Sequence, residues 1–247
     1  ETIVISGGRI VGRRHRPALP SGAPQRTSEA AALEALEVAL TDSVDVHQRA
    51  DVPYAMFLSG GIDSSAILAL MARLNDTPVR AYTAGFPGTE VADERAHARR
   101  VAQACGAEHV EIAFEPSDFW SQLPAIAAAM DEPVADYAIL PTWKLAQVAA
   151  KDHKVILSGE GGDEIFGGYG RYRSLMRPWW QGGRGMRRRG ILDGLGVLRQ
   201  DDPAWRDGIA AAEVVLRTGG RSRLQVAQAV DCADWLPNDL LTKLDRC

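Results

Sequence analysis

The residues with the clearest chemical potential form one run, Ser59-Gly60-Gly61-Ile62-Asp63-Ser64-Ser65, directly after an apolar stretch that ends at Leu58. Glycines allow the backbone to approach an anion closely, and serine hydroxyls can donate hydrogen bonds to phosphate oxygens. A Walker-type loop would need a lysine and then serine or threonine after its glycines, and this run has none. Residues 59–65, called the glycine–serine loop from here on, therefore predict a phosphate site of another kind.

Asp63 is the residue of this loop that indicates a metal ion. Two like charges ~4 Å apart repel by ~4 kcal/mol at an effective dielectric constant of ~20, so a carboxylate beside a polyphosphate is unfavourable. A divalent cation between the two removes this cost, and the sequence therefore predicts Mg²⁺ at Asp63. The alternative is that Asp63 only caps a helix. The strand before the loop and the Asp-Ser-Ser within it favour the phosphate interpretation.

A second run, residues 158–169, combines glycines with carboxylates and is called the glycine–carboxylate run. Glu160, Asp163 and Glu164 place three carboxylates within five residues. Such a cluster beside a phosphate loop is costly unless a metal ion or cationic substrate groups compensate it. An acidic helix start would explain Asp163 and Glu164 through the helix dipole. It does not explain why the run contains five glycines within ten residues.

Both runs are expected at one edge of a β-sheet, because each follows a predicted strand. Short apolar runs bounded by turn residues predict strands at 53–58, 79–86, 109–114 and 154–158. Apolar residues at helical spacing predict helices at about 28–49, 63–75, 93–105, 117–130 and 139–151. This alternation predicts an α/β fold with a parallel twisted sheet and helices on both faces. Ligands bind at the carboxyl ends of such strands, which should bring together Ser59-Gly60-Gly61, Ala84-Gly85 and Ser158-Gly159.

Composition excludes several classes of protein. The chain has 247 residues, a net charge of −4, 46% hydrophobic residues and 24% charged residues, which is ordinary for a soluble domain and argues against nucleic acid as a partner. No apolar run approaches the ~18–20 residues that span a bilayer, and no signal peptide is recognisable. The cysteines lack metal-binding spacing and fit a reduced cytoplasm: Cys105, Cys232 and Cys247. A homodimer is left open.

Residues 1–26 are expected to close a preceding domain and to link it to the sheet domain, residues 27–247. Apolar residues on either side of Gly7-Gly8 predict a small β-hairpin. Prolines and a glycine between Pro17 and Pro24 predict a linker. The basic residues near the hairpin are interpreted as a solvated face.

Taken together, the two runs resemble the asparagine synthetase family in its ATP-dependent synthetase domain. The family pattern Ser-Gly-Gly-x-Asp-Ser is matched by residues 59–64. The pattern Ser-Gly-Glu/Asp-Gly-x-Asp-Glu-x-Phe-Gly-Gly-Tyr is matched by residues 158–169. Asp131-Glu132-Pro133 and Leu140-Pro141-Thr142 also resemble family segments. The resemblance covers most of residues 28–173 and implies the adenine nucleotide α-hydrolase-like fold of the pyrophosphate-loop ATP pyrophosphatases.

The resemblance also implies a chemistry, in which a carboxylate is joined to the α-phosphate of ATP and an amine attacks the acyl-adenylate. The implied ligands of the pyrophosphate are Ser59, Gly60, Gly61, Asp63, Ser64 and Ser65. The adenosine site would be lined by Leu58, Ala84 and Gly85, and the nucleotide and acyl-adenylate would contact Ser158 and Gly159. Glu160 corresponds to the position important for adenylation. Asp63 and Asp163 would bind Mg²⁺, and Asp163 is counted with Glu160 among the catalytic residues.

Aspartate is the favoured carboxylate, which would make the product asparagine, with nitrogen from glutamine or ammonia. Related cyclases and amidotransferases of secondary metabolism, similar to enzymes that make β-lactams or lasso peptides, are an alternative. A nucleotide-binding fragment without chemistry is another. The resemblance implies a glutaminase domain before residue 27 as the ammonia source. It also implies a C-terminal continuation that carries a lysine for amide formation. Lys243 is not assigned the role of that lysine.

Overall fold

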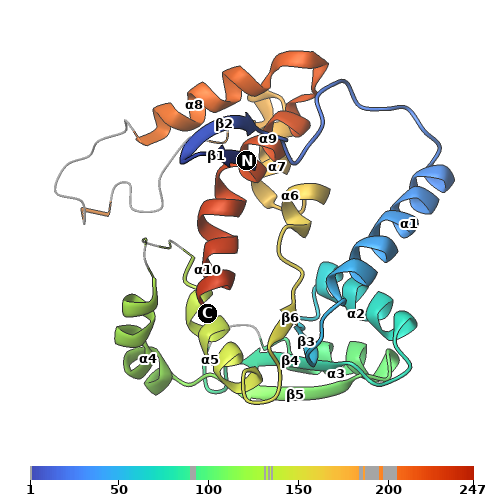
Figure 1. Ribbon diagram of the computed structural model, residues 1–247, viewed down its shortest axis with the longest axis vertical. Coiled ribbons are helices and arrows are strands. Elements are labelled where there is room, and N and C mark those ends of the chain that lie inside the picture. Colours follow the sequence, from blue (N-terminus) through green and yellow to red (C-terminus); the bar gives the residue numbers. More distant parts are fainter. Residues whose placement is uncertain are drawn as a thin grey trace. The chain divides into compact units, whose positions relative to one another are not determined.

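The computed structural model describes residues 2–89, 93–130, 132, 134, 136–183, 186, 195–196 and 205–247. It divides into two compact units, whose elements are shown in Figure 1. The first unit comprises Glu1–Gln25 and Asp163–Pro237, and the second comprises Arg26–Gly162 and Asn238–Cys247. Two of the residues noted for their resemblance, Asp131 and Pro133, lie outside the described residues. The assignment of 1–26 and 27–247 to separate domains stays a prediction.

The second unit is built on a parallel sheet with the spatial order β5-β4-β3-β6. The chain runs outward from β3 through β4 to β5 and then returns to place β6 on the other side of β3. This reversal creates a topological switch point at the carboxyl ends of β3 and β6, where ligand sites of open α/β sheets lie. The predicted strands and the parallel sheet are confirmed, with the bounds β3 (Tyr54–Phe57), β4 (Arg80–Gly85), β5 (Glu108–Ala113) and β6 (Val155–Leu157).

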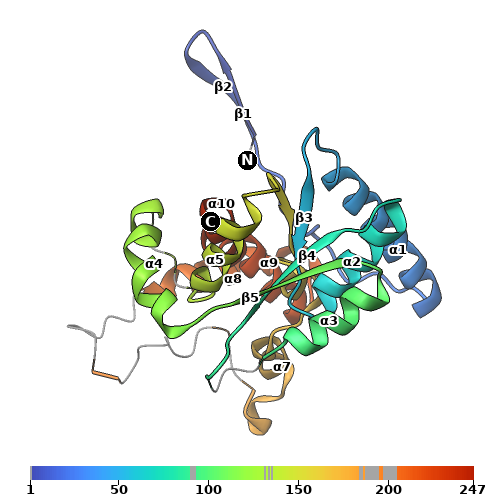
Figure 2. The same ribbon diagram turned by 90° about the horizontal axis from the view of Figure 1, so that it is seen from below.

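Side-chain alternation along β3 gives the sheet an apolar core on each face. Met56 packs with residues of α1, α2 and α3, whereas the neighbouring Ala55 belongs to the core that contains α5. Figure 2 shows α1, α2 and α3 on one side of the sheet and α4 and α5 on the other. The predicted helices over both faces are confirmed, with the bounds α1 (Glu29–His47), α2 (Ile62–Leu74), α3 (Arg95–Ala104), α4 (Pro116–Ala129) and α5 (Ile139–Ala149). The unit ends with α10 (Leu241–Arg246).

The first unit contains the predicted hairpin, which is confirmed as an antiparallel pair of β1 (Thr2–Ser6) and β2 (Arg9–Arg14). Gly7 and Gly8 form the turn with φ angles of +55° and +73°, a conformation that glycine adopts without strain. The helical part of the unit consists of α6 (Gly162–Phe166), α7 (Gly170–Met176), α8 (Trp205–Leu216) and α9 (Arg223–Ala233). In the described part of the chain, no helix is both long and apolar enough to cross a membrane.

A buried carboxylate organises the interior of the first unit. Asp231 on α9 is 5% exposed and accepts hydrogen bonds from Arg171, at 2.9 Å from Nη2, and from the Tyr172 hydroxyl. The Tyr169 hydroxyl donates to Glu164, which is fully buried, at 2.6 Å. Burial, followed by these carboxylate contacts, raises the pKa of both tyrosines, so both hydroxyls remain donors at neutral pH. These bonds connect α6 and α7 with each other and with α9.

We expect Asp231→Asn to lower the free energy of unfolding by about 3 kcal/mol, because it leaves the partly buried Arg171 cation without its carboxylate partner. Urea denaturation followed by circular dichroism would measure the loss. Arg217→Gln is the control, since the Arg217 side chain is 69% exposed in its i,i+4 pair with Glu213 at 3.6 Å, and its loss should cost less than about 1 kcal/mol. Equal losses in the two variants would contradict a structural role for the Asp231 cluster.

Candidate functional site

The glycine–serine loop leaves the carboxyl end of β3 and becomes the N-terminus of α2, with Gly61 as the N-cap. Gly60 has a φ of +82°, a left-handed conformation that strains residues with a side chain. A Cβ at this position would lie 2.9 Å from the His97 ring and 3.1 Å from the backbone nitrogen of Ala98. Position 60 therefore requires glycine for two separate reasons, backbone conformation and the closeness of α3.

We expect Gly60→Ala to lower the free energy of unfolding by about 2–3 kcal/mol, because a left-handed conformation alone costs ~1–2 kcal/mol and the contact with α3 adds to it. Gly88→Ala is the matched control. Gly88 also has a positive φ, +71°, but among the described residues its Cβ would meet no atom within 4 Å. Urea denaturation of both variants separates the two causes. A loss at Gly60 no larger than the loss at Gly88 would show that α3 does not restrict the loop.

The serine hydroxyls of the loop are arranged around its backbone. The Ser59 and Ser64 oxygens lie 3.0 Å apart, and the Gly61 N–H donates to the Ser59 oxygen at 3.1 Å. Ser64 also donates to the Gly61 carbonyl at 3.2 Å. The Ser65 oxygen is buried and, within the described residues, has no hydrogen-bond partner. A buried hydroxyl left in this state at a helix N-terminus fits an oxygen-rich anion as its missing partner.

The first part of the glycine–carboxylate run, residues 158–162, follows β6 and packs on the glycine–serine loop within the second unit. A Cβ on Gly159 would lie 2.9 Å from the Ser64 nitrogen, and one on Gly162 would lie 2.4 Å from the Asp63 Cγ. The two glycines therefore leave the space that the N-terminus of α2 and the Asp63 side chain occupy. The structure thus brings together the start of both runs at the switch point between β3 and β6.

Asp163 belongs to the first unit, where its side chain lies against Gly168: a Cβ on that glycine would fall 1.8 Å from the Asp163 Oδ1. Its carbonyl accepts hydrogen bonds from the Gly167 and Gly168 N–H groups at 2.9 and 3.0 Å. Within the described ranges, no group of three His, Cys, Asp or Glu side chains is arranged to hold a metal ion. The assignment of Asp63 and Asp163 to one Mg²⁺ stays a prediction.

The carboxyl end of β4 is connected to the glycine–serine loop through Leu58. The Leu58 carbonyl accepts a hydrogen bond from the Thr83 hydroxyl at 2.6 Å. The Leu58 N–H donates to the Tyr82 carbonyl of β4 at 2.9 Å. Ala84 follows Thr83 on the strand, and the Arg95 side chain lies so close to Gly85 that a Cβ there would fall 2.0 Å from Nε. Contact of Leu58, Ala84 and Gly85 with adenosine stays a prediction.

Glu160 has a side-chain partner, Lys243, that the sequence pattern did not predict, and Lys243 has a second partner of its own. The Glu160 Oε1 lies 2.9 Å from the Lys243 Nζ, and the same nitrogen lies 2.6 Å from the Asp136 Oδ2. All three residues belong to the second unit. No local pattern could have revealed the cluster, because Lys243 is 83 residues from Glu160 and 107 residues from Asp136.

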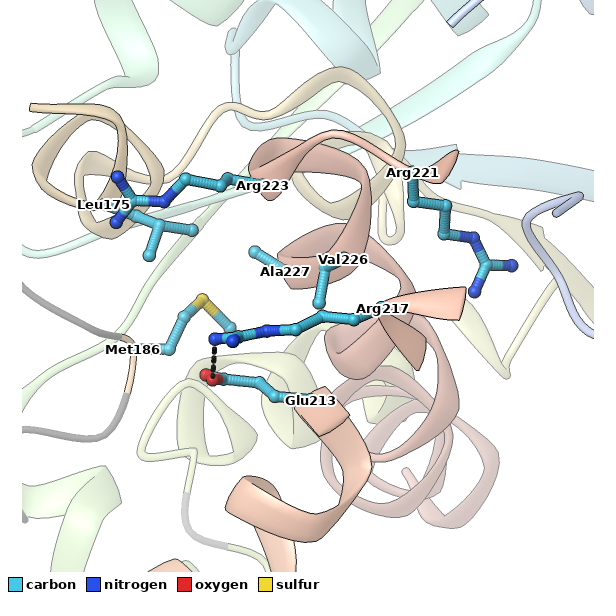
Figure 3. A pocket seen from close by; sticks show the side chains of 8 residues that line it. All are labelled: Leu175, Met186, Glu213, Arg217, Arg221, Arg223, Val226 and Ala227. Atoms are coloured by element: carbon cyan, nitrogen blue, oxygen red, sulfur yellow. Dashed lines mark ion pairs between the residues drawn. The ribbon is translucent and has the colours of Figure 1, made fainter. Parts of the chain in front are cut away.

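The first unit contains a pocket of about 510 Å³. Figure 3 shows the side chains that line it. Arg217 and Glu213 form an i,i+4 ion pair in its lining, and the Arg221 guanidinium donates to the carbonyls of Leu19 and Pro20. None of the predicted site residues lines the pocket. The lining consists of Leu175, Met186, Glu213, Arg217, Arg221, Arg223, Val226 and Ala227.

Known proteins match this chain over most of its length. The profile of the family described as asparagine synthase matches residues 35–247. A putative asparagine synthetase [glutamine-hydrolyzing] of Mycobacterium tuberculosis is 33% identical over 275 residues, which cover 96% of this chain and 42% of that protein. Asparagine synthetase [glutamine-hydrolyzing] 1 of Bacillus subtilis is 38% identical over 153 residues, or 62% of this chain and 24% of that protein. Amidase chry2 of Gibberella zeae is 32% identical over 167 residues, which cover 61% of this chain and 25% of that protein.

The fold and the site define an α/β domain that places a glycine-rich loop at the switch point of a parallel sheet. The matched residues identify the family within that class: the chain belongs to the asparagine synthetase family. The family predicted from the two runs is therefore confirmed. The chain spans 42% of the length of the mycobacterial relative and about a quarter of the Bacillus relative.

Proposed function

We propose that the protein to which this chain belongs is an ATP-dependent, amide-forming ligase that adenylates a carboxylate and transfers the acyl group to ammonia. The observation that carries this proposal is the packing of Gly159 and Gly162 against Ser64 and Asp63. It places a loop suited to pyrophosphate directly beside the loop that carries Glu160. Family membership supports the same reaction class.

In this proposal the glycine–serine loop holds the pyrophosphate part of ATP. The N-terminus of α2 provides backbone N–H groups and the positive end of the helix dipole. The buried Ser65 hydroxyl gains a phosphate oxygen as its partner, and Ser59 and Ser64 exchange their mutual hydrogen bond for bonds to phosphate. Asp63 and Asp163 would hold Mg²⁺, which when bound supplies neutralisation of phosphate charge.

Glu160 is the residue that we assign to the adenylation step itself. Its side chain is 30% exposed, so it can reach a substrate, and Lys243 fixes one of its oxygens. Adenylation requires no covalent bond to the protein, and catalysis therefore consists of positioning the reactants and stabilising developing charge. A fixed carboxylate next to the nucleotide loop is suited to orient a donor group of the substrate during this step.

We propose aspartate as the carboxylate and glutamine-derived ammonia as the nitrogen source, in keeping with the names of the mycobacterial and Bacillus relatives. The reaction would take place in the cytoplasm. Incubating the full-length protein with aspartate, glutamine and Mg²⁺–ATP tests the proposal by product analysis. The expected products are asparagine, glutamate, AMP and pyrophosphate in equal amounts. Formation of ADP and phosphate instead would overturn the adenylation mechanism.

A second candidate keeps adenylation and changes the carboxylate to one of secondary metabolism. The similarity to a relative that is named an amidase, amidase chry2, and not an asparagine synthetase supports a carboxylate other than aspartate. A panel of amino acids, β-amino acids and peptide carboxylates in the same product assay discriminates the two candidates. AMP formation that depends on aspartate alone would reject this alternative.

A further inference from the structure

Lys243 is 1% exposed, although lysine side chains are rarely buried unless they are paired. Its Nζ bridges the Asp136 Oδ2 at 2.6 Å and the Glu160 Oε1 at 2.9 Å. Asp136 precedes α5, Glu160 follows β6, and Lys243 lies on α10. The cluster therefore joins three segments of the second unit that are distant in the sequence.

The bridging ammonium keeps its charge. Burial lowers the pKa of Lys243, but the hydrogen bonds with Asp136 and Glu160 and the charges of these carboxylates raise it, and the net shift is upward. Lys243 is therefore a cation at neutral pH. An ammonium has three N–H donors, and two of them are directed at the two carboxylates.

Exposure distinguishes the roles of the three side chains. Lys243 is too deeply buried to touch a ligand, whereas the side chain of Glu160 is 30% exposed and that of Asp136 is 17% exposed. Lys243 therefore holds Glu160 from the protein interior, while Glu160 remains open to solvent. In the described part of the chain, no second side chain donates a hydrogen bond to the Glu160 carboxylate.

We propose that Lys243 is a positioning residue for Glu160, an inference that rests on the proposed role of Glu160 in adenylation. Asp136 fixes the ammonium, the ammonium fixes Oε1 of Glu160, and Oε2 is left for the reacting groups. Lys243 acts through Glu160 and makes no contact with the substrate. This separates it from the lysine for amide formation that the family resemblance expects in a later segment.

The test uses the full-length protein with Lys243→Met, and measures carboxylate-dependent exchange of labelled pyrophosphate into ATP together with the Kd for Mg²⁺–ATP. The exchange rate is expected to fall about 100-fold, because small misplacements of a reacting group have effects of this size, while the Kd changes less than about twofold. Lys243→Arg should restore most of the rate, since a guanidinium can also bridge two carboxylates. An unchanged rate in Lys243→Met would overturn the proposal.

Lys144→Met is the matched control. Lys144 also pairs with one carboxylate of the second unit, Asp118, but both side chains are at least 20% exposed and neither contacts Glu160. Its exchange rate should stay within about twofold of the parent rate, as expected for removal of a partly exposed pair. If Lys243→Met does not fold, Asp136→Asn tests the proposal instead, because it keeps the Lys243 ammonium but removes the charge of the second carboxylate that holds it. A parent-like rate in Asp136→Asn would then overturn the proposal.

A double-mutant cycle tests whether Lys243 acts through Glu160. In a Glu160→Gln background, Lys243→Met should reduce exchange by less than about twofold further, because coupled residues are not additive. A full additional loss would show an independent role and overturn the proposal.

A crystal structure of Lys243→Met gives a readout that needs no activity. We expect the Glu160 side chain to leave its position there, and an unmoved Glu160 would overturn the positioning role. This result remains interpretable even if no carboxylate supports exchange in the parent protein. In that case the proposed function fails, while the structural link between Lys243 and Glu160 is still decided.

Discussion

Glu160→Gln in the full-length protein is expected to block adenylation and to leave Mg²⁺–ATP binding intact. The substitution preserves the shape of the side chain and removes the negative charge that faces the Lys243 ammonium at 2.9 Å. Loss of one preorganised polar group typically costs 10²–10³-fold in rate, and we expect a reduction in pyrophosphate exchange of about that size. The Kd for Mg²⁺–ATP, measured by calorimetry, should change by less than about twofold, because the glycine–serine loop is untouched.

Glu108→Gln provides the control, since Glu108 forms an exposed pair with Arg80 at 2.8 Å and is not one of the predicted site residues. It should retain exchange within about twofold of the parent protein. Comparable losses in Kd and in exchange for Glu160→Gln would contradict the assignment, because they would place Glu160 in nucleotide binding.

Asp63→Asn is expected to have the second largest effect, which is an increase in the Mg²⁺ concentration that exchange requires. The Asp63 side chain lies in the space left by Gly162, and asparagine has the same shape, so the packing of the two loops should persist. Removal of the charge should raise the Mg²⁺ concentration needed for half-maximal exchange by about 10–100-fold. Titration of Mg²⁺ at fixed ATP measures this shift, and thermal unfolding checks that the fold is retained.

Asp76→Asn is a suitable comparison, because Asp76 is an exposed residue after the end of α2. Its Mg²⁺ titration should overlay that of the parent protein. An Asp63→Asn titration that also overlays it would show that Asp63 is an N-terminal helix residue without a role in metal binding.

Local sequence pattern was sufficient to predict most elements of this fold. The apolar runs of β3 and β6 are short and bounded by turn residues, and Gly7-Gly8 readily adopts the positive φ angles of a tight turn, so strands and hairpin follow from local chemistry. The parallel pairing followed from the alternation of strands with helices. The return of β6 to the side of β3 depends on sheet topology, which no periodicity encodes.

The candidate site was predictable where glycine had to leave space, and not where distant charges meet. The glycines at positions 159 and 162 are visible in the sequence. The structure gives their reason, because a side chain at either position would collide with the N-terminus of α2 or with Asp63. Lys243, by contrast, has the appearance of an ordinary surface lysine on a short helix, and its burial depends on Asp136, which is 107 residues away. The glycine–carboxylate run was also treated as one segment, whereas the compact units divide it between Gly162 and Asp163.

Exchange of labelled pyrophosphate into ATP by the full-length protein is the most direct test of adenylation. The reverse of the first half-reaction incorporates label only if a carboxyl-adenylate forms at the site built by the glycine–serine loop and Glu160. We expect exchange that requires both Mg²⁺ and aspartate and that Glu160→Gln lowers by about 10²–10³-fold. Cleavage of ATP without exchange, whichever carboxylate is supplied, would contradict the proposed function.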